Sequence, residues 1–160
     1  MSFARLLSQL LTLLSPLFLS PQTPLQTKTG IAWLASKAKE EGVITNPSGL
    51  LYKVLTSSTS PAKSPLVGTP CECHYAGTLI NGKEFDSSYK RGSPTTFAPN
   101  QVIKGWTEAM QLMKEGDKWE LYIPSELAYG DRGAGGSIPG GAPLVFTLEL
   151  LKVKGASKEL

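Results

Sequence analysis

Hydrophobic residues recur at helical spacing in one part of the chain and at strand-like spacing in several others. From Val102 onward they fall at i, i+4, i+7, i+8 and i+11, which gives an α-helix one apolar face. That face consists of Val102, Trp106, Ala109, Met110 and Met113. Apolar alternation, or position beside a turn, predicts strands at 51–55, 71–76, 83–86, 118–123 and 144–150. The pattern therefore predicts an α+β fold, in which a curved antiparallel sheet of about five strands wraps over one short helix.

The segments between these stretches have the composition of turns and loops. Asn81-Gly82 predicts a two-residue hairpin turn, which would fix the register of the strands on either side. We expect loops at 56–65 and 87–99. The stretch 128–143 contains six glycines and two prolines. A compact domain seldom carries so long a loop without a purpose, so we expect it to serve a function.

The first 19 residues are rich in leucine, contain one arginine and are interrupted by Pro16. Their length is that of a signal peptide and is short for a membrane span, so export from the cytosol is the favoured interpretation. Import into an organelle by a transit peptide is an alternative, because Ser and Thr are frequent and no acidic residue precedes Glu40. An uncleaved membrane anchor is a third. After processing, no stable membrane span is expected.

Composition divides the chain into four parts. A short helix is expected at 31–41, with Thr29 near its N-cap and Gly42 as its end. The four parts are a signal- or transit-like segment with a polar linker at 1–28, the short helix and its connection at 29–48, the main domain at 49–154, and a tail at 155–160.

Charge and side-chain chemistry exclude several functions. The net charge is +3 and the basic residues are scattered, so nucleic acid is not an expected partner. Cys71 and Cys73 would lie side by side on one face of a strand, which is a poor geometry for a disulfide. His74 is the only histidine, and alternation places it on the opposite face. No serine stands in a nucleophile-elbow pattern, so Ser–His catalysis is not expected. A metal site is not expected either, because His74 and the cysteines point to opposite faces and there is no second cluster of ligands.

The aromatic residues instead predict an apolar cleft. Trp106 would form its floor, and Asp86 is the one carboxylate beside an aromatic residue. Such a pocket, mostly aromatic with a few directed polar groups, is typical of a ligand site. On pattern alone, ordinary core packing of Trp106 and a turn or surface role for Asp86 stay open as alternatives. The expected walls are Tyr75, Phe85, Phe97, Val102, Ile103, Tyr129, Ile138 and Phe146.

Several motifs occur along the chain in a fixed order. They are Tyr75-Ala-Gly, Phe85-Asp86-Ser-Ser, Phe97, Val102-Ile103-Lys-Gly-Trp106, Ala128-Tyr129-Gly, Ile138-Pro139 and Leu144-Val-Phe146. Together they resemble the FKBP-type peptidyl-prolyl cis-trans isomerases, over about 49–154. Upstream, the stretches 38–43 and 47–54 look like the segment that leads into this domain in the macrophage infectivity potentiator subgroup. That subgroup often carries a long helical dimerisation arm, which is almost absent here, so a monomer is expected.

The resemblance implies an FKBP-like fold and catalysis of rotation about X-Pro bonds in Pro-containing polypeptides, with no cofactor and no metal. By analogy, the proline ring would lie on Trp106, while the backbone N–H of Ile103 and the hydroxyl of Tyr129 would hold flanking carbonyls. Asp86, held by Tyr75 and Arg91, would orient the twisted amide. Macrolides such as tacrolimus and rapamycin would bind the same pocket. The implied catalytic residues are Asp86, Tyr129, Ile103 and Trp106, and the implied substrate-binding residues are Tyr75, Phe85, Arg91, Phe97, Val102, Ile138 and Phe146.

Three positions depart from the family pattern. Many members have an aromatic residue in place of Thr95, a bulkier side chain in place of Ala134 and an aliphatic one in place of Ser137. We expect these changes on the rim of the cleft, where they would alter substrate preference, rate and macrolide affinity more than the activity itself. The alternative function is a catalytically weak binding module or chaperone for Pro-containing partners. The presence of Asp86 and Tyr129 together with the tryptophan favours an active isomerase that assists protein folding outside the cytosol.

Overall fold

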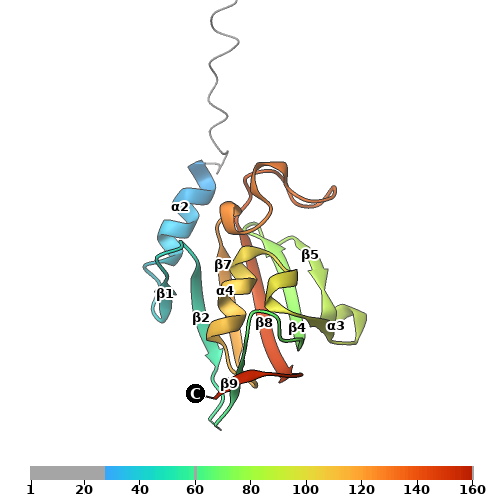
Figure 1. The fold of residues 1–160 in the computed structure, drawn as a ribbon. Coiled ribbons are helices and arrows are strands. Elements are labelled where there is room, and N and C mark those ends of the chain that lie inside the picture. The colour runs from blue at the N-terminus through green and yellow to red at the C-terminus, as the bar shows by residue number, and fades with distance from the viewer. Residues whose placement is uncertain (1–27, 60, 160) are drawn as a thin grey trace, which may run out of the picture.

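The computed structural model describes residues 28–59 and 61–159. Its main strands are β1 (Val43–Thr45), β2 (Leu51–Thr56), β4 (Cys71–Leu79), β5 (Glu84–Ser87), β6 (Thr95–Phe97), β7 (Lys118–Ile123) and β8 (Leu144–Val153). They form one antiparallel sheet in the order β1-β2-β7-β8-β4-β5, and β6 also pairs with β4 (Figure 1). A second sheet pairs β3 (Lys63–Pro65) with β9 (Ser157–Glu159). The helices are α2 (Lys28–Lys37), α3 (Ser88–Arg91) and α4 (Lys104–Leu112), with 3-10 turns η1 (Pro99–Gln101), η2 (Ser125–Leu127) and η3 (Gly130–Arg132).

The apolar face of α4 packs on one side of the main sheet, as its spacing predicts. Trp106, Ala109 and Met110 are buried there, in the same cluster as every second residue of β4, β7 and β8. Gly105 lets α4 approach β7 closely, because a Cβ at Gly105 would lie 2.6 Å from Cγ2 of Ile123. The predicted α+β architecture is therefore confirmed, with one short helix in the concave side of the sheet (Figure 1).

Helix α2 covers the other side of the sheet near β2 and β7. Leu34 is buried against Leu51 and Tyr122, and the ring of Trp33 meets that of Tyr122 edge-on at 5.8 Å between centroids. Alternating apolar and polar residues are typical of a strand with one buried face, but Tyr122 on the opposite face of β7 is 2% exposed. The second buried face therefore depends on a helix from outside the main domain.

The bounds of α2 differ from the helix expected at 31–41. Thr29 lies within the helix instead of capping it, and the helix ends at Lys37. After Lys37 the chain makes i to i+3 hydrogen bonds, and Gly42 at φ 80° turns it into β1. Gly42 thus ends a series of turns and not the helix itself. The sequence does not distinguish the two positions, because each accepts a glycine in the left-handed conformation.

Several short elements were not expected from the sequence. The predicted loops contain β3, α3 and β6, and the connection before the main domain contains β1. With β1 and β6 added, the main sheet has seven strands where about five were expected. The hairpin turn between β4 and β5 has three residues and not two, because Leu79 pairs with Lys83 and Gly82 takes a left-handed conformation. Among the described residues, no helix is long and apolar enough to cross a bilayer. The segment predicted as an export signal lies outside the described residues.

Candidate active site

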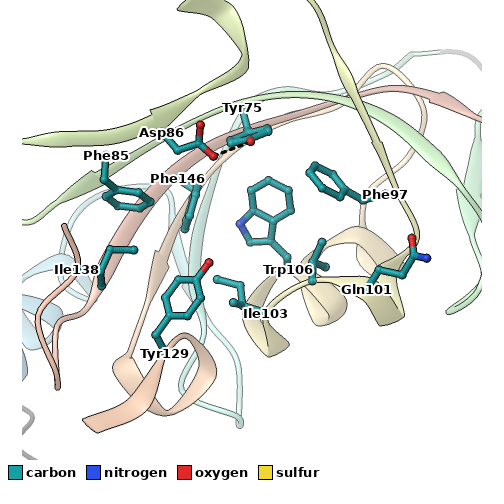
Figure 2. A pocket seen from close by; sticks show the side chains of 11 residues that line it. Tyr75, Phe85, Asp86, Phe97, Gln101, Ile103, Trp106, Tyr129, Ile138 and Phe146 are labelled. Carbon is teal, nitrogen blue, oxygen red and sulfur yellow. Dashed lines mark hydrogen bonds between the residues drawn. The ribbon is translucent and has the colours of Figure 1, made fainter. Parts of the chain in front are cut away.

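A pocket of about 520 Å³ opens above the N-terminal end of α4 (Figure 2). It lies between the inner face of β4 and β8 and the loop that follows η2. Six of its eleven lining residues are aromatic, which makes it the kind of apolar cavity with a few polar groups that ligands occupy. Its lining residues are Tyr75, Phe85, Asp86, Phe97, Gln101, Val102, Ile103, Trp106, Tyr129, Ile138 and Phe146.

The indole of Trp106 forms the floor of this pocket and is 4% exposed. Three rings stand edge-on to it, at centroid distances of 5.1 Å for Tyr75, 5.8 Å for Phe97 and 5.1 Å for Phe146. Edge-to-face contacts of this kind are favourable and fix the orientation of the rings. They leave one face of the indole as a flat apolar surface at the bottom of the cavity.

The carboxylate of Asp86 is held at one wall by two side chains. The hydroxyl of Tyr75 donates to Oδ2 at 2.7 Å (Figure 2), and Arg91 forms an ion pair with Oδ1. Burial alone would raise the pKa of Asp86, but the hydrogen bonds from Tyr75 and Arg91 and the charge of Arg91 outweigh it and lower the pKa below its usual value. The carboxylate is therefore ionised at neutral pH and fixed in direction.

Two polar groups at the opposite wall have no partner among the described residues. Ile103 occupies the N-cap of α4, and its backbone N–H makes no hydrogen bond to any residue that the structure describes. The hydroxyl of Tyr129 likewise has no partner in the described ranges, and Figure 2 shows it directed toward the pocket. Both groups can donate a hydrogen bond to a carbonyl of a bound ligand.

The loop that carries Tyr129 and Ile138 keeps its shape through glycines at close backbone contacts. Ala134 and Ile138 exchange backbone hydrogen bonds of 3.0 and 3.1 Å, which close the loop and direct Ile138 into the pocket. A Cβ at Gly133 would lie 2.1 Å from the carbonyl oxygen of Ile138, and one at Gly140 would lie 1.9 Å from that of Asp131. Only glycine fits at these two positions, which explains part of the glycine content of the loop.

The structure brings together in this pocket every residue expected at the site except Arg91. Arg91 was expected among the substrate-binding residues, but it lies behind the wall, where it binds Asp86 and donates to the hydroxyl of Tyr75 at 2.7 Å. Gln101 lines the pocket and was not expected there. It ends the turn η1, where its side chain accepts from the backbone N–H of Ala98. Its position directly before Val102 was the only signal in the sequence.

The positions that depart from the family pattern stand outside the lining. Thr95, Ala134 and Ser137 are not among the pocket residues. Thr95 lies 3.5 Å from the guanidinium of Arg91 through its Oγ1. Ala134 forms the base of the hydrogen-bonded loop and precedes the exposed Ser137. These positions can therefore reach a bound ligand only where it extends beyond the pocket.

Comparison with known proteins agrees with this geometry. The family model described as FKBP-type peptidyl-prolyl cis-trans isomerase matches residues 62–151. A second model, for the domain amino terminal to such isomerases, matches residues 21–54. The chain belongs to the FKBP-type peptidyl-prolyl cis-trans isomerases, and it is thereby an enzyme of that class. Within this family it is similar to the macrophage infectivity potentiators, as its upstream motifs had indicated.

Individual relatives show how much of each protein the chain covers. It is 44% identical to the macrophage infectivity potentiator of Trypanosoma cruzi, over 91% of this chain and 83% of that protein. It is 49% identical to the FKBP-type 22 kDa peptidyl-prolyl cis-trans isomerase of Escherichia coli, over 78% of this chain and 59% of that protein. It thus spans only about half to three fifths of such bacterial relatives.

Solved structures show the same fold. The crystal structure of FkpA from Escherichia coli matches with a TM-score of 0.74 and 46% identity, over 80% of this chain and 59% of that one. A peptidyl-prolyl cis-trans isomerase from Pseudomonas syringae also matches with a TM-score of 0.74, at 39% identity, over 81% of this chain and 94% of that one. The fold predicted from the sequence is confirmed at the level of the family.

Proposed function

We propose that this chain accelerates cis-trans rotation about X-Pro bonds in protein substrates and thereby assists their folding. The observation that carries the proposal is the aromatic pocket above Trp106, with the single oriented carboxylate of Asp86 in its wall. The pocket has room for a proline ring and its two flanking peptide groups. The membership of the chain in the FKBP-type isomerase family supports the same activity.

Cis-trans rotation breaks no covalent bond of the substrate. Resonance makes the amide planar, and the uncatalysed barrier is roughly 18–20 kcal/mol. As the bond twists, resonance is lost, the carbonyl becomes less polar and the proline nitrogen becomes more basic. A dry aromatic pocket favours this less dipolar state over the planar one. Lowering the barrier by about 7 kcal/mol would accelerate rotation about 10⁵-fold.

We assign the lining residues roles on this basis. The proline ring lies on Trp106, and the backbone N–H of Ile103 and the hydroxyl of Tyr129 hold the flanking carbonyls. Asp86 acts by its fixed charge on the twisted amide and not as an acid or base, because rotation transfers no proton. Arg91 positions Asp86 without touching the substrate, consistent with its place behind the wall.

The finer properties form part of the same proposal. The pocket binds macrolides of the tacrolimus and rapamycin type, which compete with substrate for the surface of Trp106. The chain acts as a monomer in a compartment reached by export. The proposal of export is supported by the leucine-rich start of the sequence and by a relative from Legionella longbeachae whose name is outer membrane protein MIP.

The test is the exchange rate of an X-Pro peptide, measured by NMR with the full chain, with and without rapamycin. Acceleration that the drug abolishes would support both the activity and the pocket. Asp86→Leu should lower kcat/KM by about tenfold or more, as expected when an oriented charge is removed from a site. Drug binding without acceleration would replace the proposal with the binding-module alternative, and unchanged kcat/KM in Asp86→Leu would refute the role of that carboxylate.

A further inference from the structure

On the edge away from β8, strand β4 lacks a strand partner at two residues beside the pocket. Cys71 to Cys73 pair with β6, and Ala76 and Gly77 pair with β5, which leaves His74 and Tyr75 between the two strands. The side chain of Ser88, the first residue of α3, fills this gap. Its Oγ lies 2.7 Å from the backbone nitrogen of Tyr75 and 3.2 Å from the carbonyl oxygen of the same residue. A side-chain hydroxyl thus satisfies both backbone groups that a strand would otherwise bind.

A third group contacts the same hydroxyl. Nδ1 of His74 lies 2.8 Å from Oγ of Ser88. The backbone N–H of Tyr75 can only donate and its carbonyl can only accept, so the single hydroxyl hydrogen of Ser88 goes to the carbonyl. The remaining contact is then satisfied only if Nδ1 of His74 carries a hydrogen and donates it to Ser88. All three hydrogen bonds together therefore fix the hydrogen of His74 on Nδ1.

This hydroxyl lies at the root of α3, the four-residue helix that carries Arg91 to the site (Figure 1). Ser88 is completely buried, and its two hydrogen bonds to the backbone of Tyr75 attach α3 to β4. The next residue, Tyr89, stacks on the imidazole of His74 with a centroid distance of 4.6 Å and an angle of 14°. Arg91, at the end of the same helix, binds both Asp86 and the hydroxyl of Tyr75. His74 on the outer face of the sheet and Asp86 at the pocket are thus connected through one short helix.

Charged groups surround His74 on the outer face. Glu149 of β8 is its cross-strand partner and accepts from the hydroxyl of Tyr89 at 2.6 Å. Lys118 of β7 lies 3.5 Å from Glu149, and its Nζ is 5.3 Å from the ring of Tyr89. Glu72, two residues earlier on β4, is paired with Lys154. In this arrangement a proton on the second ring nitrogen leaves the bond from Nδ1 to Ser88 in place, so the ionisation of His74 does not break the connection.

We propose that His74 is a positioning residue of the isomerase site, which acts through the hydroxyl of Ser88 to hold α3 and the side chain of Arg91 against Asp86. This inference rests on the proposed function, because Asp86 matters to turnover only if the pocket is an isomerase site. No contact between His74 and substrate is involved, since the imidazole lies on the opposite face of the sheet from the pocket.

The first test uses the unaltered protein. His74 is the only histidine in the chain, so its two ring nitrogens give unambiguous ¹⁵N NMR signals. We expect the neutral imidazole to carry its hydrogen on Nδ1 and to show a coupling across the hydrogen bond to Ser88. A neutral ring with its hydrogen on Nε2 would overturn the proposal. This measurement is independent of catalysis, so it stays decisive even if the chain shows no isomerase activity.

The second test compares two amide substitutions at the same position. In His74→Asn the side-chain nitrogen is bonded to Cγ, as Nδ1 is in histidine, so it can still donate to Ser88. In His74→Gln the nitrogen lies one bond further out, where Nε2 had been. Both variants lose the charge and the imidazole, so their difference isolates the donor at the Nδ1 position. We expect kcat/KM to stay within about twofold for Asn and to fall about fivefold for Gln, the size expected for one lost hydrogen bond.

The titration of Asp86, followed by ¹³C NMR of its carboxyl group, separates positioning from general destabilisation. Arg91 helps to lower the pKa of Asp86, so a displaced α3 should move that pKa toward its usual value in the Gln variant and leave it unchanged in the Asn variant. Equal behaviour of the two variants in both kcat/KM and titration would overturn the proposal. If His74→Gln does not fold, the tautomer of the unaltered protein decides the question. If the wild-type chain is inactive but the pKa of Asp86 still differs between the Asn and Gln variants, the proposed function is refuted. The positioning role of His74 then stands.

Discussion

At Gly77 the backbone of β4 lies close to two rings of the aromatic wall of the pocket. A Cβ at this position would lie 2.5 Å from Cε1 of Phe146 and 2.7 Å from Cζ of Phe85. Ordinary contact begins at 3.4 Å, so the ring of Phe146 would have to retreat by about 0.9 Å. Gly77→Ala is therefore a one-carbon change whose effect falls directly on two pocket residues.

Neither ring can retreat freely. Phe146 is 4% exposed and its centroid is 5.1 Å from that of Trp106, while Phe85 meets Phe146 edge-on at 5.5 Å. Overpacking of this kind costs about 1–3 kcal/mol. The lower entropy of the unfolded chain with alanine offsets about 0.4–1 kcal/mol of that cost. We expect Gly77→Ala to lower the free energy of unfolding by about 1–2 kcal/mol, which leaves the domain folded.

The effect on turnover should be larger than the effect on stability. A displacement near 1 Å in a site can cost about 100-fold in rate, so we expect kcat/KM for an X-Pro peptide to fall by about tenfold or more. Urea denaturation and NMR exchange measure the two quantities separately. Gly136→Ala is the matched control, because a Cβ there meets nothing within 4 Å. Wild-type kcat/KM in Gly77→Ala would refute the reasoning, since it would mean that the contact between Phe85 and Phe146 does not shape the pocket.

Three further predictions test other parts of the molecule. Because the pKa of Asp86 is held below its usual value, its charge persists as the pH falls, and activity should decline only below about pH 4. Arg91→Leu should move this decline to higher pH, and coincident acid limbs would contradict that. Gly105→Ala gains about 1 kcal/mol of helix propensity but places a Cβ 2.6 Å from Ile123, so a net loss of about 1 kcal/mol in unfolding free energy is expected by urea denaturation. The same change in an Ile123→Ala background should become neutral or stabilising, and an equal loss in both backgrounds would exclude the clash. Trp33→Ala removes an edge-on ring contact between α2 and β7 and should cost about 1 kcal/mol in stability with kcat/KM unchanged. A lower kcat/KM would show that α2 affects the pocket.

Elements with a long repeat of their own could be predicted from the sequence. The apolar face of α4 extends over about two and a half turns, and the alternation of β8 over most of ten residues, so each carries its own evidence of periodicity. The three-residue strands β1, β3, β6 and β9 have too few positions to show any period. Their conformation comes from the strand beside them, as when β6 pairs with Cys71 to Cys73, and this information is not local.

The same distinction applies to the candidate site. Its apolar residues come from elements with clear patterns or from recognisable motifs, so the sequence indicated the walls and Trp106 as the floor. Gln101 reaches the pocket because the turn η1 directs it there, and a three-residue turn leaves no pattern. Arg91 was expected among the substrate-binding residues and as a partner of Asp86, and α3 carries it to that carboxylate but outside the pocket lining. Its distance from the pocket follows from where that helix begins, which composition alone does not specify.

The polar half of the site and the break in strand pairing along β4 are one structural feature. A continuous strand along this edge would have satisfied the backbone groups of Tyr75 and left no place for a helix. Because β5 ends at Ser87, the chain can form α3 within the gap, with Ser88 bound to β4 and Arg91 next to Asp86. The carboxylate of Asp86 is then oriented by groups from both sides of the break, Tyr75 from β4 and Arg91 from α3. An insertion that closed this gap with strand pairing would preserve the aromatic floor and walls but remove the groups that hold the charge in place.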